Sequence, residues 1–92
     1  MGERRYPPLT PAEVAAIVEA LGFRFKRQTR SHAHYEREAD AVRPRRVVTV
    51  DMSMREFSER IIRSMIQQSR SSREDFYGAN RRTARKIGLS MD

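Results

Sequence analysis

The sequence predicts an α+β domain in the order helix, three antiparallel strands and helix, followed by a short C-terminal helix or basic tail. Three observations support this prediction: a capped helix near the N-terminus, three short strand-like segments, and a second apolar stripe at helical spacing. The 92 residues suffice for one small domain. We expect an N-terminal arm over residues 1–9, the domain over residues 10–78 and a basic tail over residues 79–92.

The first helix has signals at both ends. Thr10 can serve as the N-cap, Pro11 suits the first helical position, and Glu13 completes a capping box. Apolar side chains then recur at helical intervals, at Val14, Ile17, Val18 and Leu21. Gly22 is expected to end the helix, because glycine readily adopts the left-handed conformation that is common just after a helix.

Three strands are expected after this helix. Residues 23–27 alternate apolar and basic side chains, residues 31–37 form the second strand, and residues 46–50 are rich in β-branched side chains. Residues 28–30 are expected to join the first two strands as a hairpin connection. The polar, proline-containing residues 38–45 are expected to form a mobile loop.

Alternation along these strands predicts one apolar and one polar face of the sheet. The two long helices should cover the apolar face, which comprises Phe23, Phe25, Ala33, Tyr35 and two of the valines at positions 47, 48 and 50. The opposite face should carry Arg24, Lys26, His32, His34 and Glu36. We expect this second face to be polar, basic and open to a ligand.

The second long helix is expected to run from a capping box at Ser53 and Glu56 to about Ser69. Its apolar stripe comprises Phe57, Ile61, Ile62, Met65 and Ile66. A third helix start is expected over residues 71–75, with Phe76 as its anchor in the core. The chain beyond it is basic and is expected to be a helix extension or a disordered tail.

The chain is strongly basic, with a formal net charge of +7 and a pI of about 11.0. Such an excess favours a polyanionic partner such as nucleic acid. The chain has no cysteine and no apolar run approaching the roughly 20 residues of a membrane span. No apolar stretch follows the basic N-terminus as it would in a signal peptide. We therefore expect a cytoplasmic protein with no disulfide and no membrane partner.

Both histidines lie in the second predicted strand. His32 and His34 would share one face about 7 Å apart, and imidazole readily exchanges a proton near neutral pH. The basic residues expected to hold RNA near them are Arg24, Lys26, Arg27, Arg30 and Arg37. Proton-transfer groups beside a phosphate-binding surface suggest RNA cleavage.

Several short motifs occur in a fixed order along the chain. They are Leu21-Gly22-Phe23, Arg27-Gln28-x-x-Ser31-His32, the strand at 46–50, Ser64-Met65-Ile66-Gln67-Gln68 and Ser72-Arg73-Glu74-Asp75-Phe76. With these motifs, the run from Pro11 to Phe76 resembles the HicA-type toxins of bacterial toxin–antitoxin pairs. The resemblance covers roughly three quarters of the chain.

The resemblance implies a fold like that of double-stranded-RNA-binding domains. It also implies an mRNA interferase, which cleaves RNA without a metal or other cofactor and is blocked by a HicB-type antitoxin. The essential histidine of the family corresponds to His32 here. Two positions depart from the family pattern: Arg30 stands where a glycine usually precedes the serine and histidine, and Asp51-Met52-Ser53 stands where many members have a Pro-x-His segment.

RNA cleavage by transesterification needs a base for the 2′-hydroxyl, an acid for the 5′-oxygen and positive charge at the phosphate. We expect His32 to act as the base or the acid and His34 to be the second candidate, as its complement. Arg30, Arg24 or Lys26 would stabilise the phosphate.

Other functions are compatible with the same residues. The His-x-His motif could bind zinc or copper if Glu36 or Asp51 added an oxygen, but with no third histidine and no cysteine we expect no metal site. A non-catalytic RNA-binding module and a protein-interaction domain are the further alternatives. The sequence leaves the oligomeric state open.

Overall fold

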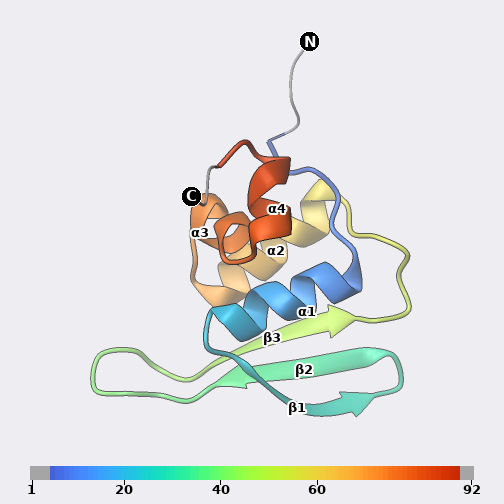
Figure 1. The fold of residues 1–92 in the computed structure, drawn as a ribbon. Coiled ribbons are helices and arrows are strands. Elements are labelled where there is room, and N and C mark those ends of the chain that lie inside the picture. The colour runs from blue at the N-terminus through green and yellow to red at the C-terminus, as the bar shows by residue number, and fades with distance from the viewer. Residues whose placement is uncertain (1–4, 90–92) are drawn as a thin grey trace.

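The computed structural model describes residues 5–89 and has the predicted α+β architecture. Within this range the elements are α1 (Pro11–Ala20), β1 (Arg24–Thr29), β2 (His32–Arg37), β3 (Arg46–Asp51), α2 (Glu59–Ser69), α3 (Arg73–Gly78) and α4 (Arg81–Lys86). The strands form an antiparallel sheet in the order β1-β2-β3. Figure 1 shows α1 to α4 on one side of this sheet.

The apolar core lies between the sheet and the helices. Ala33 and Tyr35 of β2 and Val48 and Val50 of β3 are buried in it. The helices contribute Val14, Ile17 and Val18 from α1 and Ile62 and Met65 from α2. The predicted apolar face of these two strands and the predicted stripes of both helices are therefore confirmed at these positions.

Helix α1 begins and ends as predicted. Oγ1 of Thr10 accepts a hydrogen bond from the Glu13 amide at 3.2 Å, and Oε1 of Glu13 accepts one from the Thr10 amide at 2.9 Å. Leu21 is the C-cap, and Gly22 follows at φ +97°, where a residue with a side chain would be strained. This turn delivers Phe23 into the core, where it is fully buried.

Strand β1 is longer and more exposed than predicted. It extends to Thr29, so the connection predicted at residues 28–30 is wrong, and a two-residue turn beginning at Arg30 takes its place. Phe25, predicted in the core, is 51% exposed and packs edge-on against Tyr35 with ring centroids 5.8 Å apart. The reason is that β1 is an edge strand, exposed along its whole length, and its pairing shifts register just after Phe25.

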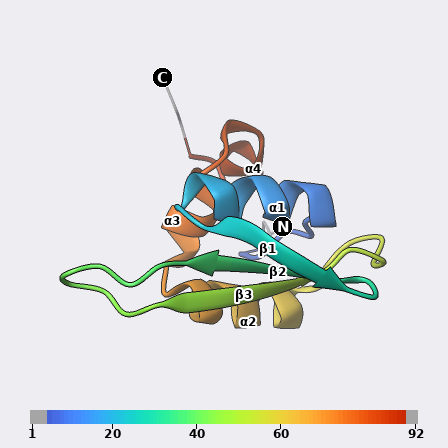
Figure 2. The same ribbon diagram turned by 90° about the horizontal axis from the view of Figure 1, so that it is seen from below.

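The two edges of the sheet differ. Figure 2 shows β2 between β1 and β3, with β3 running beside α2. The Thr49 amide on the outer side of β3 donates a hydrogen bond to Oε1 of Gln68 at 3.1 Å. Helix α2 thus satisfies part of the β3 edge, whereas β1 forms the opposite edge of the sheet.

Helix α2 begins later than the capping box predicted at Ser53 and Glu56. The helix spans Glu59–Ser69, and its N-cap residue is Ser58. Ser53 instead donates two hydrogen bonds to Oδ1 of Asp51, from its hydroxyl at 2.7 Å and from its amide at 3.0 Å. These bonds close a turn directly after β3, and this turn competes with a helix start at the same residues.

The N-terminal arm is held by residues from the second half of the chain. The Phe57 amide donates to the Leu9 carbonyl at 2.7 Å, and both side chains are buried. The Tyr77 hydroxyl donates to the Pro7 carbonyl at 2.7 Å, and the Lys86 ammonium group donates to the Pro8 carbonyl at 2.7 Å. Phe57 therefore pairs with the N-terminal arm and lies before the start of α2.

The residues expected to form a basic tail include helix α4. Thr83 and Ala84 are fully buried, and Oγ1 of Thr83 donates to the Tyr77 carbonyl at 2.6 Å. Residues 1–4 of the expected arm and 90–92 of the expected tail lie outside the described residues. Between residues 5 and 89, no helix is long and apolar enough to cross a membrane.

Candidate functional site

The candidate site lies on the sheet face that points away from the helices, which we call the open face. Because directly paired residues of an antiparallel sheet share a face, the register defines its members. They are His32 opposite Asp51 and Thr29, His34 opposite Thr49 and Arg27, and Glu36 opposite Val47 and Arg24. Their neighbours in sequence, Ala33 and Tyr35, point into the core. The predicted placement of both histidines and Glu36 on one face therefore agrees with the structure.

His32 and Asp51 form the closest imidazole–carboxylate pair on this face. Nε2 of His32 lies 3.7 Å from Oδ2 of Asp51, and the two side chains are 52% and 30% exposed. The hydroxyl and amide of Ser53, then the Ser31 hydroxyl and the positive charge of His32, hold the pKa of Asp51 below its usual value. The carboxylate is therefore ionised at neutral pH and places a negative charge beside the imidazole.

Asp51 was missed as a partner of His32 in the sequence, where it appeared only as a possible metal ligand. The two residues are far apart along the chain, and only the β2–β3 register brings them together. A sequence signal exists in retrospect, because Asp51 ends a strand and is followed two residues later by a serine that can close an Asx-type turn.

His34 lies beside a small hollow of about 100 Å³ on the same face. Its Nδ1 is 3.3 Å from the Thr49 hydroxyl, so one of these two atoms donates to the other. The remaining residues that line the hollow are Lys26, Arg27, Glu36, Arg45 and Val47. Two predicted RNA-contact residues, Lys26 and Arg27, thus lie next to His34.

Glu36 is the buried carboxylate of the open face, with its side chain only 8% exposed. Its Oε1 lies 3.3 Å from Nζ of Lys26, and its Oε2 pairs with Nε of Arg45. Burial of a carboxylate is tolerated when cations and hydrogen bonds compensate it. Arg45, which the sequence prediction had placed only in a mobile loop, therefore belongs to the site.

The other predicted RNA-contact residues lie outside this hollow, each in a different place. Arg30 lies in the turn two residues before His32. Nη1 of Arg24 donates to the Phe23 carbonyl at 3.0 Å and so turns toward the end of α1. Arg37 lies on the helix side of the sheet, with its guanidinium carbon 4.8 Å from the centre of the Phe23 ring. Arg37 is therefore too far around the sheet to act beside the histidines.

Metal binding finds no support in the described part of the chain. Among residues 5–89, no three histidine or carboxylate side chains gather as a metal site requires. The open face instead offers two imidazoles, the carboxylates of Asp51 and Glu36 and a set of basic side chains, which are groups suited to proton transfer and to holding a phosphate.

Comparisons with protein-family models, with curated proteins and with solved structures find no match to this chain. The resemblance to HicA-type toxins therefore stays a prediction from the sequence motifs. Function has to be inferred from the residues of the open face themselves.

Proposed function

We propose that the open face binds RNA and cleaves its backbone without a metal ion. The observation that carries this proposal is the pairing of His32 with the ionised carboxylate of Asp51, beside His34 and next to basic side chains. A carboxylate close to one ring nitrogen attracts that edge of the imidazole electrostatically and so helps to orient the ring. The other ring nitrogen is then available to exchange a proton with the RNA.

His32 is the proposed catalytic residue and Asp51 a positioning residue. In the reaction a base takes the proton of the 2′-hydroxyl, the 2′-oxygen attacks the phosphorus, and the 5′-oxygen leaves with a proton from an acid. The products are a cyclic 2′,3′-phosphate and a free 5′-hydroxyl. His34, two residues along the strand, supplies the second proton-transfer group.

Positive charge for the phosphate comes chiefly from Arg27 and Arg30. Lys26 and Arg45 share the single negative charge of Glu36, so these three groups together contribute one net positive charge. RNA held in this way loses affinity as salt concentration rises, because bound counterions are released when cations neutralise phosphates.

The family resemblance extends the proposal to a biological setting. A HicA-like toxin acts on mRNA in the bacterial cytoplasm, and a HicB-type antitoxin would inhibit it. The alternative proposal is a non-catalytic RNA-binding module on the same fold. Its support is the segment Asp51-Met52-Ser53, which stands where many family members carry a second histidine.

Incubation of RNA with the purified protein in EDTA tests the proposal. We expect cleavage by the wild-type protein and a rate about 10²- to 10⁴-fold lower for His32→Ala, with unchanged circular dichroism. His34→Ala is the matched variant and should lose less activity. RNA cleavage at the wild-type rate by a folded His32→Ala protein would reject the proposal. Salt-sensitive RNA binding without cleavage by any folded variant would favour the binding module.

A further inference from the structure

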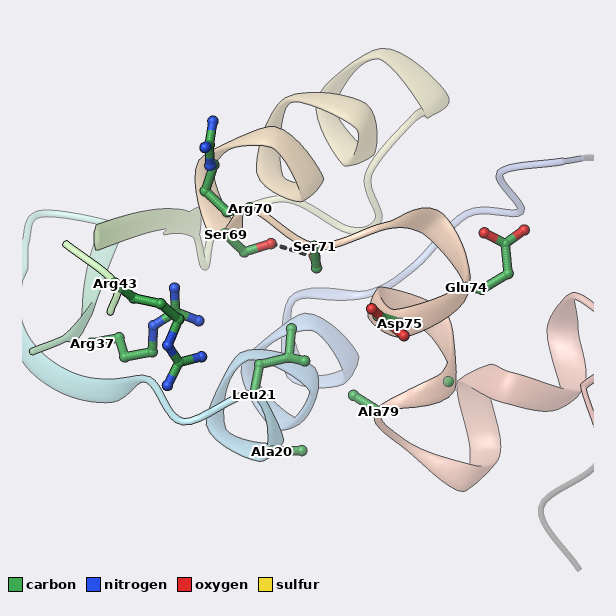
Figure 3. A pocket seen from close by; sticks show the side chains of 11 residues that line it. Ala20, Leu21, Arg37, Arg43, Ser69, Arg70, Ser71, Glu74, Asp75 and Ala79 are labelled. Carbon is green, nitrogen blue, oxygen red and sulfur yellow. Dashed lines mark hydrogen bonds between the residues drawn. The ribbon is translucent and has the colours of Figure 1, made fainter. Parts of the chain in front are cut away.

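A larger pocket lies on the helix side of the sheet, on the opposite face from the histidines. It has a volume of about 430 Å³ and is bounded by the end of α1, the loop after β2, the end of α2 and the beginning of α3 (Figure 3). Ligand sites for small organic molecules usually have volumes of roughly 300–1,000 Å³. The pocket is therefore large enough for a nucleotide-sized ligand.

The charges around this pocket are separated. Figure 3 shows the Arg37 and Arg43 side chains close together on one side, and Glu74 and Asp75 on the other. Glu74 is already paired, because its Oε2 lies 2.6 Å from Nη1 of Arg73 outside the pocket. An anionic group would therefore be attracted to the arginine side and repelled from the opposite side.

Arg37 lacks the acceptors that a partly buried guanidinium requires. Its Nε is buried and has no hydrogen-bond partner among the described residues 5–89. The guanidinium carbon lies 4.8 Å from the centre of the Phe23 ring. Burial, and then the positive charge of Arg43, lowers the pKa of Arg37. A buried donor without an acceptor costs free energy. An anionic ligand that accepted a hydrogen bond from Arg37 would remove this cost.

The carbonyl groups at the two neighbouring helix ends bond to arginines other than Arg37. The carbonyl groups at the end of α2 accept hydrogen bonds from Arg46, at 3.3 Å from Gln68 and 3.4 Å from Gln67. At the end of α1, the Glu19 carbonyl accepts one from Arg24 at 3.4 Å. Other arginines thus already occupy the partially negative ends of both helices. On the other side of Arg43, Asp40 accepts two hydrogen bonds from the Arg43 guanidinium, at 3.1 and 3.2 Å.

We propose that this pocket binds the phosphoryl group of a nucleotide-sized molecule, with Arg37 and Arg43 donating to the phosphoryl oxygens. Arg37 and the Nη1 group of Arg43, which is not bonded to Asp40, can donate to separate oxygens of one phosphoryl group. On the opposite side, the negative charge of Asp75 favours an uncharged or hydrogen-bond-donating part of the ligand. This site is separate from the proposed RNA cleavage, because the histidines lie on the other face of the sheet.

Calorimetric titration and amide chemical-shift mapping of the full chain test the proposal. The probes are inorganic phosphate, adenosine 5′-monophosphate, adenosine and acetate. We expect binding of the first two only, with shifts in residues around Arg37 and Ser71. A 5′-phosphorylated DNA trinucleotide, which has no 2′-hydroxyl to react, identifies the source of the phosphoryl group. Tighter binding of the trinucleotide indicates a nucleic-acid end, and tighter binding of the mononucleotide indicates a free nucleotide.

Four substitutions distinguish binding in this pocket from general charge effects and from the histidine site. Arg37→Gln should weaken binding of adenosine 5′-monophosphate about tenfold or more. Arg43 lies in an exposed loop, and Arg43→Gln should also weaken binding of adenosine 5′-monophosphate. This variant keeps the test informative if Arg37→Gln does not fold. Arg60→Gln, at the far end of α2, removes the same charge and should bind normally. His32→Ala should also bind normally.

Two results would overturn the proposal. One is the absence of binding of both phosphate and adenosine 5′-monophosphate at millimolar concentrations. The other is an equal loss in Arg60→Gln and Arg37→Gln, which would indicate attraction by net charge alone. Neither result depends on RNA cleavage, so failure of this proposal and failure of the proposed nuclease are distinguishable.

Discussion

Nε2 of His32 on β2 lies 3.7 Å from Oδ2 of Asp51 at the directly paired position of β3. The turn after β3 fixes the carboxylate, because Ser53 donates two hydrogen bonds to its other oxygen, Oδ1. One oxygen of Asp51 is therefore used for structure, and the other faces the imidazole. This division of roles makes Asp51 a positioning residue whose charge can be tested without breaking the turn.

Asp51→Asn should slow RNA cleavage about fivefold, as expected for loss of an exposed ion pair. The amide oxygen of asparagine can still accept from Ser53, so circular dichroism and thermal melting should stay close to wild type. Glu56→Gln is the control, since it removes an exposed carboxylate elsewhere. An equal effect of both substitutions would argue against a specific role for Asp51.

Glu36→Gln should lower stability and strengthen RNA binding at the same time. The substitution leaves Lys26 and Arg45 without their shared anion, and we expect the free energy of unfolding to fall by about 1 kcal/mol because both cations are largely exposed. The released cations should steepen the dependence of RNA affinity on salt. Urea unfolding and filter binding at several salt concentrations measure the two effects. Glu38→Gln, with the same change in charge, should leave unfolding unchanged; unchanged RNA affinity in Glu36→Gln would contradict the prediction.

Arg30→Gly should stabilise the fold and weaken RNA binding. Arg30 has φ +57°, a conformation that is strained for arginine and free of strain for glycine. We expect a gain of about 0.5–1 kcal/mol in the free energy of unfolding, which corresponds to a few degrees in melting temperature. Gln28→Gly, inside β1, should have the opposite effect on stability. A lower melting temperature for Arg30→Gly would show that the arginine makes compensating contacts.

Tyr77→Phe should destabilise the protein by about 1 kcal/mol, because the Pro7 carbonyl loses its donor. Burial also raises the pKa of Tyr77 far above its ordinary value of about 10. The folded state thus favours the neutral phenol, so this contribution to stability is complete below about pH 10 and is lost as the pH rises above that value. Unfolding measured between pH 8 and about pH 11 should show a steeper loss for wild type than for Tyr77→Phe. Parallel pH dependence in the two proteins would contradict the assignment.

Local signals in the sequence predicted α1 correctly and α2 only in part. The capping box of α1 involves Thr10 and Glu13, which bond to each other in both directions even though Lys86 also contacts Oε1 of Glu13. The same pattern at Ser53 and Glu56 is overridden, because Ser53 bonds to Asp51 and Phe57 pairs with the N-terminal arm. A capping pattern therefore predicts a helix start only where the flanking residues have no stronger tertiary partner.

The exposure of Phe25 and the position of Arg37 also depend on tertiary structure and were harder to predict. Alternation places Phe25 on the apolar side of β1, yet β1 is an edge strand of the sheet and leaves this side chain half exposed. Arg37 continues the apolar side of β2 and stacks on Phe23 instead of joining the basic residues near the histidines. The prediction from charge thus grouped Arg37 with the basic residues near the histidines, whereas the sheet places them on opposite faces.

The sequence by itself determined the order of the elements, the ends of α1 and the shared face of His32, His34 and Glu36. These features depend on spacing within one element and on contacts between residues a few positions apart. Only the tertiary structure decided that Asp51 meets His32 and that Glu36 lies between Lys26 and Arg45. The physical reason is strand register, because a shift of one residue would move every side chain of a strand to the other face of the sheet.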